Sequence, residues 1–332
     1  MSVVSILGAG GWGLGLALAA LRAGNKVIVW SPFADEVEQL RTDREHKKLL
    51  AGIKIPQEIL ITDNLADISG CDITVIATPS FAVRQTAARL KDLNCGTLVS
   101  VAKGIEYDSM MRLSEVIKDE LPQAQVVVLS GPSHAEEVAR GIETSLVASS
   151  EDDFLASKVQ AAFSSEKLRV YTNNDVVGVE LGGAIKNVIA SAAGFCDGLG
   201  LGDNTKAALI TRGLSEMARL GKALGAKRST FAGLTGMGDL IVTCTSVHSR
   251  NHRFGEMVAK GATVQEALEA VGTVEGYHAA KIVKKLASLN KIEMPISEQC
   301  FAVMYENRPV ASAVSALMTR PGRPESDYDW IK

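Results

Sequence analysis

Three ionisable side chains in the second half of the sequence have the chemistry that proton transfer and anion binding require. Lys186 is the single cation in the apolar, glycine-rich segment 180–190, and a buried lysine is costly unless it is paired or functional. Asp239 follows a glycine turn and could hold Lys186 or a substrate hydroxyl, or simply cap the next segment. Arg250 could anchor a phosphate or carboxylate, because its planar guanidinium donates two parallel hydrogen bonds. The alternatives are a solvent-facing lysine and a plain basic loop around Arg250.

The glycines at the N-terminus indicate which cofactor would serve such chemistry. An apolar strand pattern runs into Gly8-x-Gly10-x-x-Gly13, and an apolar helical pattern follows over residues 14–21. Strand, tight glycine turn and helix form the pyrophosphate site of dinucleotide-binding proteins. Gly8 permits the turn, Gly10 lets the backbone approach a phosphate, and Gly13 lets the helix pack close to the strand. The first N–H groups of the helix then point at the anion.

The sequence leaves the choice between NAD and NADP open. The residues after the second predicted strand meet the adenosine ribose, where an acid suits NAD and an arginine suits NADP. This chain has Ser31-Pro32-Phe33 there, which is neither. Asp35 comes a little late, and Arg41 and Arg44 come later still.

Three more polar residues extend the candidate set for hydride transfer to or from an alcohol or ketone. Asn187 could orient a substrate oxygen or cap a backbone group. Lys103 ends a strand pattern and could bind a substrate oxygen or be solvated. Glu275 could accept a hydrogen bond from the nicotinamide amide or be a helix-end acid. We interpret His134 as a helix-start residue and not as a base.

The elements that must position these residues follow from hydrophobic periodicity. Strands are expected at 3–7, 26–30, 59–61, 72–77, 97–101, 126–129, 146–148 and 168–171. Their alternation with helical patterns predicts a Rossmann-type, mostly parallel sheet. Ligands bind beyond the carboxyl ends of such strands, which places the loops 8–13, 31–33, 78–81, 103–104 and 131–135 at one edge.

Helical spacing dominates from about residue 175. Ile210, Leu214 and Met217 share a helical face, and Thr263-x-x-Glu266 is a capping-box signature. We therefore expect an α/β chain of two domains, a dinucleotide-binding domain at 1–180 and an all-helical substrate-binding and catalytic domain at 181–332. A length of 332 residues is consistent with two domains.

Composition excludes several classes of protein. The net charge of −3 makes nucleic acid an unsuitable partner. The five cysteines are scattered without a C-x-x-C pair or a cysteine–histidine cluster, so we expect no disulfide framework, no metal site and a cytoplasmic location. The uncharged N-terminal stretch lacks a basic n-region and is interrupted by glycines, so we expect neither a signal peptide nor a membrane span.

Six motifs in order, from residue 3 to roughly 315, resemble the NAD(P)-dependent glycerol-3-phosphate dehydrogenases of bacterial type. They are Gly8-Ala9-Gly10-Gly11-Trp12-Gly13, Ser130-Gly131-Pro132-Ser133, Leu181-Gly182-Gly183-Ala184-Ile185-Lys186-Asn187, Leu209-Ile210-Thr211-Arg212-Gly213, Gly238-Asp239-Leu240 and Ser249-Arg250-Asn251. The resemblance implies reversible reduction of dihydroxyacetone phosphate to sn-glycerol 3-phosphate with NAD or NADP as cofactor, feeding glycerophospholipid synthesis. It also implies a homodimer.

The resemblance implies a role for each matching residue. Lys186 would accept the proton in glycerol-phosphate oxidation and donate it in reverse. The implied substrate contacts are Lys103, Gly131, Ser133, Asp239, Ser249, Arg250 and Asn251. The implied cofactor contacts are Gly11, Trp12, Phe33, Lys103, Ala135, Arg250 and Glu275.

Two departures from the family pattern concern the cofactor. Many relatives carry Ser or Ala at the position of Gly11, which should be harmless. Many carry His, Arg or Asn within the stretch 31–33, so a preference for NADP is not indicated, and we expect both cofactors to work. Two other functions stay open, a related two-domain dehydrogenase of a 3-hydroxy acid or sugar acid, and a non-catalytic nucleotide-sensing protein.

Overall fold

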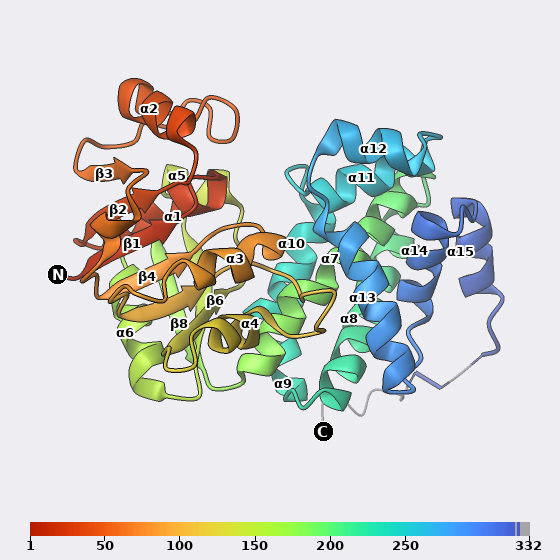
Figure 1. Ribbon diagram of the computed structural model, residues 1–332. Helices are drawn as coiled ribbons and strands as arrows, with labels where there is room; N and C mark the ends of the chain where they lie inside the picture. The colour runs from red at the N-terminus through yellow and green to blue at the C-terminus, as the bar shows by residue number, and fades with distance from the viewer. Residues whose placement is uncertain (323, 326–332) are drawn as a thin grey trace. The chain divides into compact units, whose positions relative to one another are not determined.

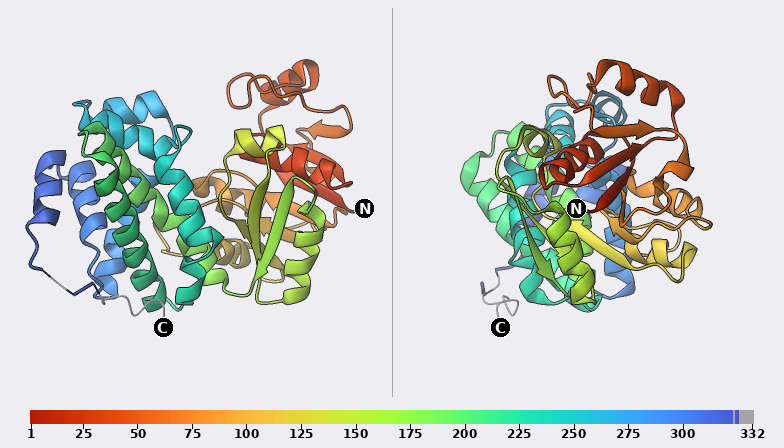
Figure 2. Two further views of the ribbon diagram at one scale, coloured as in Figure 1. Left: turned by 180° about the vertical axis from the view of Figure 1, so that it is seen from behind. Right: turned by 90° about the vertical axis from the view of Figure 1, so that its left-hand side faces the viewer.

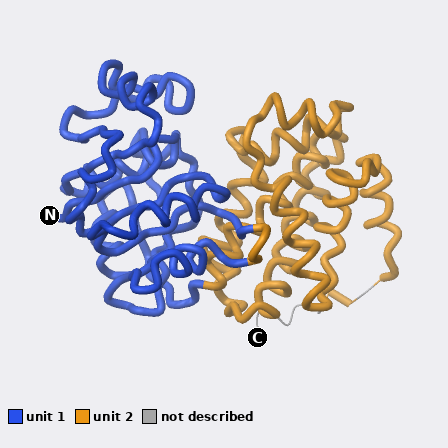
Figure 3. The backbone as a smooth tube through the Cα atoms, viewed as in Figure 1, with its two compact units in different colours: residues 1–106, 111–176 blue, residues 107–110, 177–332 orange. Residues whose placement is uncertain are grey.

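The computed structural model describes residues 1–322, 324 and 325, and it divides into two compact units (Figure 3). Unit 1 comprises residues 1–106 and 111–176, and unit 2 comprises residues 107–110 and the chain from residue 177 onward. The change from strand to helix patterns predicted near residue 175 coincides with the first residue of the long helix α7, Val176.

Unit 1 is built on a single eight-stranded sheet. Its strands are β1 (Val3–Leu7), β2 (Lys26–Trp30), β3 (Ile59–Thr62), β4 (Ile73–Ile76), β5 (Thr97–Ser100), β6 (Val126–Ser130), β7 (Thr144–Ser149) and β8 (Leu168–Asn173). The spatial order is β3-β2-β1-β4-β5-β6-β7-β8, and the first six strands are parallel. That order, 3-2-1-4-5-6, is the one of dinucleotide-binding sheets. The prediction of a mostly parallel sheet is confirmed, while β7 runs antiparallel to β6.

Helices cover both faces of this sheet (Figures 1 and 2). The helical segments are α1 (Gly11–Arg22), α2 (Ala34–Asp43), η1 (Leu65–Ile68), η2 (Ser80–Ala82), α3 (Val83–Ala88), α4 (Leu113–Glu120), α5 (Ala135–Arg140) and α6 (Asp153–Phe163). Side chains of α1, α5 and α6 share one hydrophobic cluster, and those of η1, α3 and α4 share another. Because successive strand residues point to opposite faces, Ile6 of β1 enters the first cluster and Leu7 the second.

Unit 2 is helical. Its segments are α7 (Val176–Gly198), α8 (Gly202–Ala223), α9 (Arg228–Phe231), η3 (Leu234–Gly238), α10 (Asp239–Thr245), α11 (Arg250–Ala259), α12 (Val264–Val271), α13 (Glu275–Leu289), α14 (Pro295–Tyr305) and α15 (Val310–Met318). The predicted capping box is confirmed at α12, where Thr263 Oγ1 accepts from the Glu266 amide and the Glu266 carboxylate accepts from the Thr263 amide.

Helix α7 is the core of unit 2. It is long and apolar enough to cross a membrane by composition, but 89% of its most apolar window is buried inside the protein, as in the core helix of a globular fold. Glycines let its neighbours approach closely. A Cβ on Gly182 would lie 2.7 Å from the Thr235 carbonyl oxygen, and one on Gly276 of α13 would lie 2.4 Å from the Asn187 carbonyl oxygen.

Candidate functional site

The glycine turn of unit 1 has the geometry that each of its glycines requires. Gly8 has a φ of +118°, in the region that favours glycine, and its amide donates to the Trp30 carbonyl of the neighbouring strand at 2.8 Å. A Cβ on Gly13 would lie 2.0 Å from the Gly8 carbonyl oxygen, so α1 passes too close to the turn for any other residue. By contrast, a Cβ on Gly10 would meet no heavy atom within 4 Å.

The open space at Gly10 is the test of whether a dinucleotide fits this chain. Gly10 is the N-cap of α1, and because it has no side chain it does not cap the first N–H groups of the helix. The positive end of α1 therefore faces the open space where a side chain at residue 10 would lie. A pyrophosphate can take that position and accept from the N–H groups of the first turn. Ala135 of α5 lies beside the same turn, with its Cβ 3.6 Å from the Cβ position of Gly11. Unit 1 therefore fits NAD or NADP.

Lys103 and the loop after β6 form a second polar cluster of unit 1. The Lys103 ammonium donates to the Gly131 carbonyl oxygen at 2.9 Å and to Ser133 Oγ at 2.8 Å. Gly131 has a φ of +128°, which turns the chain sharply at the end of β6. The structure thus brings together three residues that are separated by 28 and 30 positions in the sequence.

In unit 2 the side chain of Lys186 is buried and paired. Its ammonium donates to Asp239 Oδ1 and to Thr243 Oγ1, both at 2.5 Å, and the two charged side chains are only 5% and 1% exposed. Asp239 begins α10 directly after the π-helical turn η3, a local distortion that is frequent at functional sites. Thr243 was not predicted. It lies four residues after Asp239 on the same helical face, and that spacing is the signal that could have identified it.

Asn187, the next residue of α7, belongs to a second network. Its side-chain oxygen accepts from the Asn251 amide group at 2.9 Å, and the Asn251 oxygen accepts from the Gly276 backbone amide at 2.8 Å. Asn251 and Gly276 are the second residues of α11 and α13. Two helix N-termini therefore meet at Asn187, and their partial positive charges favour an anion there.

The remaining predicted residues of unit 2 occupy the starts of α11 and α13. Ser249 is buried and caps α11 by accepting from the His252 amide at 3.2 Å. Arg250 follows as the first residue of that helix and is exposed. Glu275 is the first residue of α13. Ser249 thus already has a structural task, while the exposed side chain of Arg250 begins at the first residue of α11.

The predicted cofactor residues Trp12 and Phe33 have different surroundings within unit 1. Trp12 is partly buried and packs against the larger hydrophobic cluster. Phe33 is the N-cap of α2 and is 67% exposed. His134 occupies the N-cap of α5, as the sequence predicted.

Two buried thiols of unit 2, Cys244 beside the Lys186 cluster and Cys196 further along α7, are not suited to nucleophilic chemistry. Burial raises the pKa of Cys244 to about 12 and that of Cys196 to about 11, so both stay protonated near neutrality. Within the described chain no group of three or more His, Cys, Asp or Glu side chains gathers as a metal site would.

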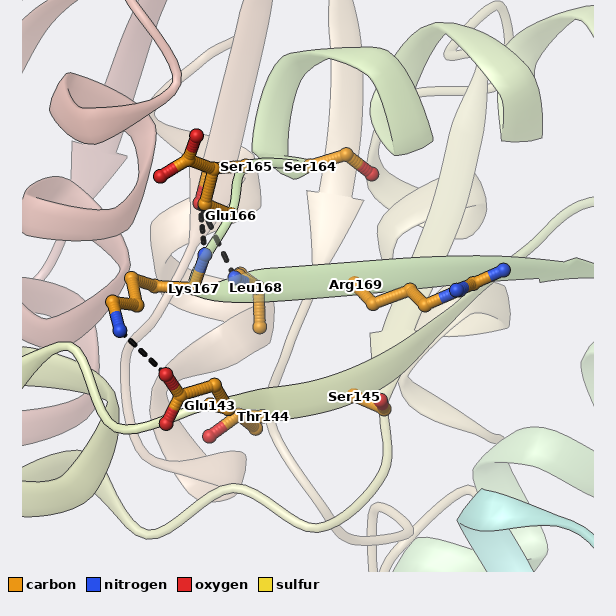
Figure 4. A pocket seen from close by; sticks show the side chains of 9 residues that line it. All are labelled: Glu143, Thr144, Ser145, Ser164, Ser165, Glu166, Lys167, Leu168 and Arg169. Carbon is orange, nitrogen blue, oxygen red and sulfur yellow. Dashed lines mark hydrogen bonds and ion pairs between the residues drawn. The ribbon is translucent and has the colours of Figure 1, made fainter.

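A hollow of about 520 Å³ lies over β7 and β8, and none of the residues that line it was predicted for the site (Figure 4). It is lined by Glu143, Thr144, Ser145, Ser164, Ser165, Glu166, Lys167, Leu168 and Arg169. An ion pair between Lys167 and Glu143 crosses it at 2.5 Å, and both side chains are half exposed or more. Such a pair contributes little to stability or recognition.

A glycine turn at the carboxyl edge of a doubly wound sheet, followed by a helical unit with a buried, paired lysine, defines a two-domain nicotinamide-dependent dehydrogenase. Residues 3–156 match the N-terminal family model of NAD-dependent glycerol-3-phosphate dehydrogenase, and residues 175–315 match its C-terminal model. The chain belongs to this family.

Known proteins resemble the chain over nearly its whole length. Glycerol-3-phosphate dehydrogenases [NAD(P)+] from Fusobacterium nucleatum and Moorella thermoacetica are 46% and 48% identical to it, and each match spans 98% of this chain and 99% of the relative. The crystal structure of a glycerol-3-phosphate dehydrogenase from Coxiella burnetii is 37% identical with a TM-score of 0.92, over 96% of this chain and 99% of that one.

Proposed function

We propose that this protein catalyses the reversible reduction of dihydroxyacetone phosphate to sn-glycerol 3-phosphate with NADH or NADPH. Residues 1–180 form the cofactor-binding domain in this proposal and residues 181–332 the substrate-binding and catalytic domain. The product would supply glycerophospholipid synthesis in the cytoplasm, and the active protein would be a homodimer. Family membership supports the reaction, and the Lys186–Asp239–Thr243 cluster is the observation that supports the chemistry.

Lys186 is the proton donor for ketone reduction in this proposal. When bound, the reduced nicotinamide would supply a hydride, a proton with two electrons, to carbon C2 of the substrate. The ammonium of Lys186 gives its proton to the oxygen on C2, and the resulting amine takes that proton back in the oxidation direction. Asp239 and Thr243 hold the Lys186 nitrogen in place at 2.5 Å each, so the proton is delivered from a fixed position.

The phosphate of the substrate is bound by groups at the start of α11. Arg250 offers two parallel donors, and the N-termini that meet at Asn187 add partial positive charge. Asn251 is the positioning residue, because its side chain links Asn187 to the Gly276 amide and so fixes α11 against α7 and α13. Lys103, with Gly131 and Ser133, is proposed as a further contact to substrate and cofactor.

A spectrophotometric assay tests the reaction. Addition of dihydroxyacetone phosphate to the protein and NADH should abolish the absorbance of the reduced cofactor, and dihydroxyacetone without phosphate should be a poor substrate. Activity with 3-hydroxy acids or sugar acids and not with dihydroxyacetone phosphate would show that the substrate is wrong. No turnover of any of these substrates would favour a nucleotide-sensing protein.

A pair of lysine variants tests the assignment of the proton donor. Lys186→Met should lower turnover about 100-fold or more while NADH still binds, because general acid catalysis contributes about 10²–10⁴-fold. Lys222→Met is the matched control, since Lys222 is an exposed lysine on α8 of the same unit. Turnover that survives in Lys186→Met would exclude the assignment.

A further inference from the structure

We propose that Glu36 makes this protein bind NAD(H) more tightly than NADP(H). This inference rests on the proposed function and concerns the end of the cofactor that the sequence left undecided. It concerns a carboxylate supplied from α2, whereas in dinucleotide-binding sheets the discriminating acid ordinarily follows β2 directly.

The carboxylate of Glu36 is fixed just beyond the end of β2. Ser31, the first residue after β2, is 1% exposed and its hydroxyl donates to Glu36 Oε2. Glu36 is the third residue of α2 and is partly exposed, so its carboxylate is anchored on one side and reaches solvent on the other. The neighbouring strand β1 ends in the Gly8 turn, whose amide bonds to Trp30, the last residue of β2. The anchored carboxylate therefore lies just beyond the end of β2, the strand that pairs with β1 and its pyrophosphate turn.

That place is where the adenosine ribose of a dinucleotide lies. A carboxylate there accepts a hydrogen bond from the 2′-hydroxyl of NAD and repels the 2′-phosphate of NADP. The positive end of α2 would otherwise favour a phosphate, but Asp35 and Glu36 both occupy its first turn and offset the helix dipole.

The two arginines that could have held a 2′-phosphate are already engaged. Arg41 Nε donates to the Ile61 carbonyl oxygen at 2.8 Å, and its guanidinium lies 3.6 Å from Asp63. Arg44 donates to two carbonyl oxygens of the segment 56–59. Both guanidinium groups connect the C-terminal end of α2 to β3 and to the residues that precede this strand.

One other side chain approaches the Glu36 carboxylate. His46 Nε2 lies 3.7 Å from Glu36 Oε1, and its Nδ1 accepts from the Leu49 amide. Ser31 donates to the other oxygen, Oε2, so His46 leaves that anchored contact at the end of β2 in place.

Direct binding of NADH and NADPH, measured by cofactor fluorescence in the absence of substrate, tests the proposal. We expect the wild-type Kd for NADPH to exceed that for NADH by about tenfold or more, since one close unit of like charge costs about that factor near a protein surface. Glu36→Gln keeps an acceptor for Ser31 and removes the charge. It should reduce the ratio of the two Kd values at least about fivefold, chiefly by tightening NADPH.

Glu38→Gln is the matched control. Glu38 is an exposed residue of the same helix, two positions further on, and it points away from the face of Glu36. Its substitution by Gln removes the same charge. Equal Kd values for the two cofactors in the wild type, or equal effects of the two variants, would overturn the proposal. A wild type that prefers NADH but does not reduce dihydroxyacetone phosphate would instead refute the proposed function and leave the role of Glu36 intact.

Discussion

We expect the buried pair of Lys186 and Asp239 to serve the reaction without raising the free energy of unfolding. Taking an ammonium and a carboxylate out of water costs several kcal/mol each, and their attraction repays this only in part. At 5% and 1% exposure this pair belongs to the buried class, in which removing one partner costs about 3–5 kcal/mol because the other charge is left uncompensated. Replacing both partners by apolar residues of similar volume is about neutral or stabilising.

Three variants turn this reasoning into an experiment. Lys186→Met and Asp239→Leu should each lower the free energy of unfolding by about 3–5 kcal/mol, and the double variant should recover most of that loss. None of the three should retain turnover above about 1% of the wild type, since the proton donor or its anchor is missing. Unfolding in urea followed by circular dichroism gives the free energies, and loss of NADH absorbance gives turnover.

An exposed pair on the same unit is the control. Lys260 and Glu256 of α11 lie at 2.5 Å like the buried pair, but their side chains are 61% and 35% exposed. Lys260→Met should therefore change the free energy of unfolding by less than about 1 kcal/mol. If the double variant loses as much stability as the two single variants added together, the pair holds unit 2 together and the reasoning is refuted.

The remaining predictions concern stability against pH and the cofactor turn. Burial raises the pKa of Glu216 to about 7 from 4.5, although its carboxylate accepts from the Ile296 and Ser297 amides. The folded state therefore binds the proton more tightly than the unfolded state, so protonation of Glu216 stabilises the fold at low pH and this contribution is lost as pH rises. Relative to Glu216→Gln, the free energy of unfolding of the wild type should fall by about 2 kcal/mol between about pH 5 and about pH 8. Identical pH profiles of urea unfolding would contradict this. Gly10→Ala should leave the unfolding midpoint unchanged and raise the Kd for NADH about tenfold or more, whereas Gly13→Ala should also destabilise the fold by about 1–3 kcal/mol; unchanged NADH binding in Gly10→Ala would exclude the turn as the pyrophosphate site.

Much of unit 1 could be predicted from its sequence because its strands are short apolar runs that end in glycine or polar residues. The range 26–30 is the observed extent of β2, and β4 and β5 fall within their predicted ranges. The direction of β7 could not be predicted, because an apolar run reads the same whether its partner is parallel or antiparallel. Its extent was underestimated as well, since the polar residues Thr144, Ser145 and Ser149 also pair with neighbouring strands.

The site was predictable to the extent that single residues are unusual in their surroundings. Lys186 is a lone cation in an apolar segment, and the sequence offers Asp239 as a partner. Only the fold shows that these residues, 53 positions apart, place Nζ and Oδ1 at 2.5 Å. The sequence does not show why glycines lie beside Lys186, whereas the structure explains Gly182 by the close approach of the Thr235 carbonyl oxygen. The link from Asn187 through Asn251 to Gly276 joins three helices and leaves no local trace in the sequence.

The order in which the chain of unit 2 is synthesised gives Lys186 a second role. Every segment that packs closely against α7 through a glycine, in η3, α8, α11 and α13, is C-terminal to α7. The 23-residue apolar segment of α7 therefore leaves the ribosome before the segments that bury it have been synthesised. During that interval it resembles a segment bound for the bilayer. A lysine near the middle of such a helix opposes insertion by about 2.5–3.5 kcal/mol. The residue proposed to move the proton in the finished protein would thus also direct the nascent chain away from the membrane.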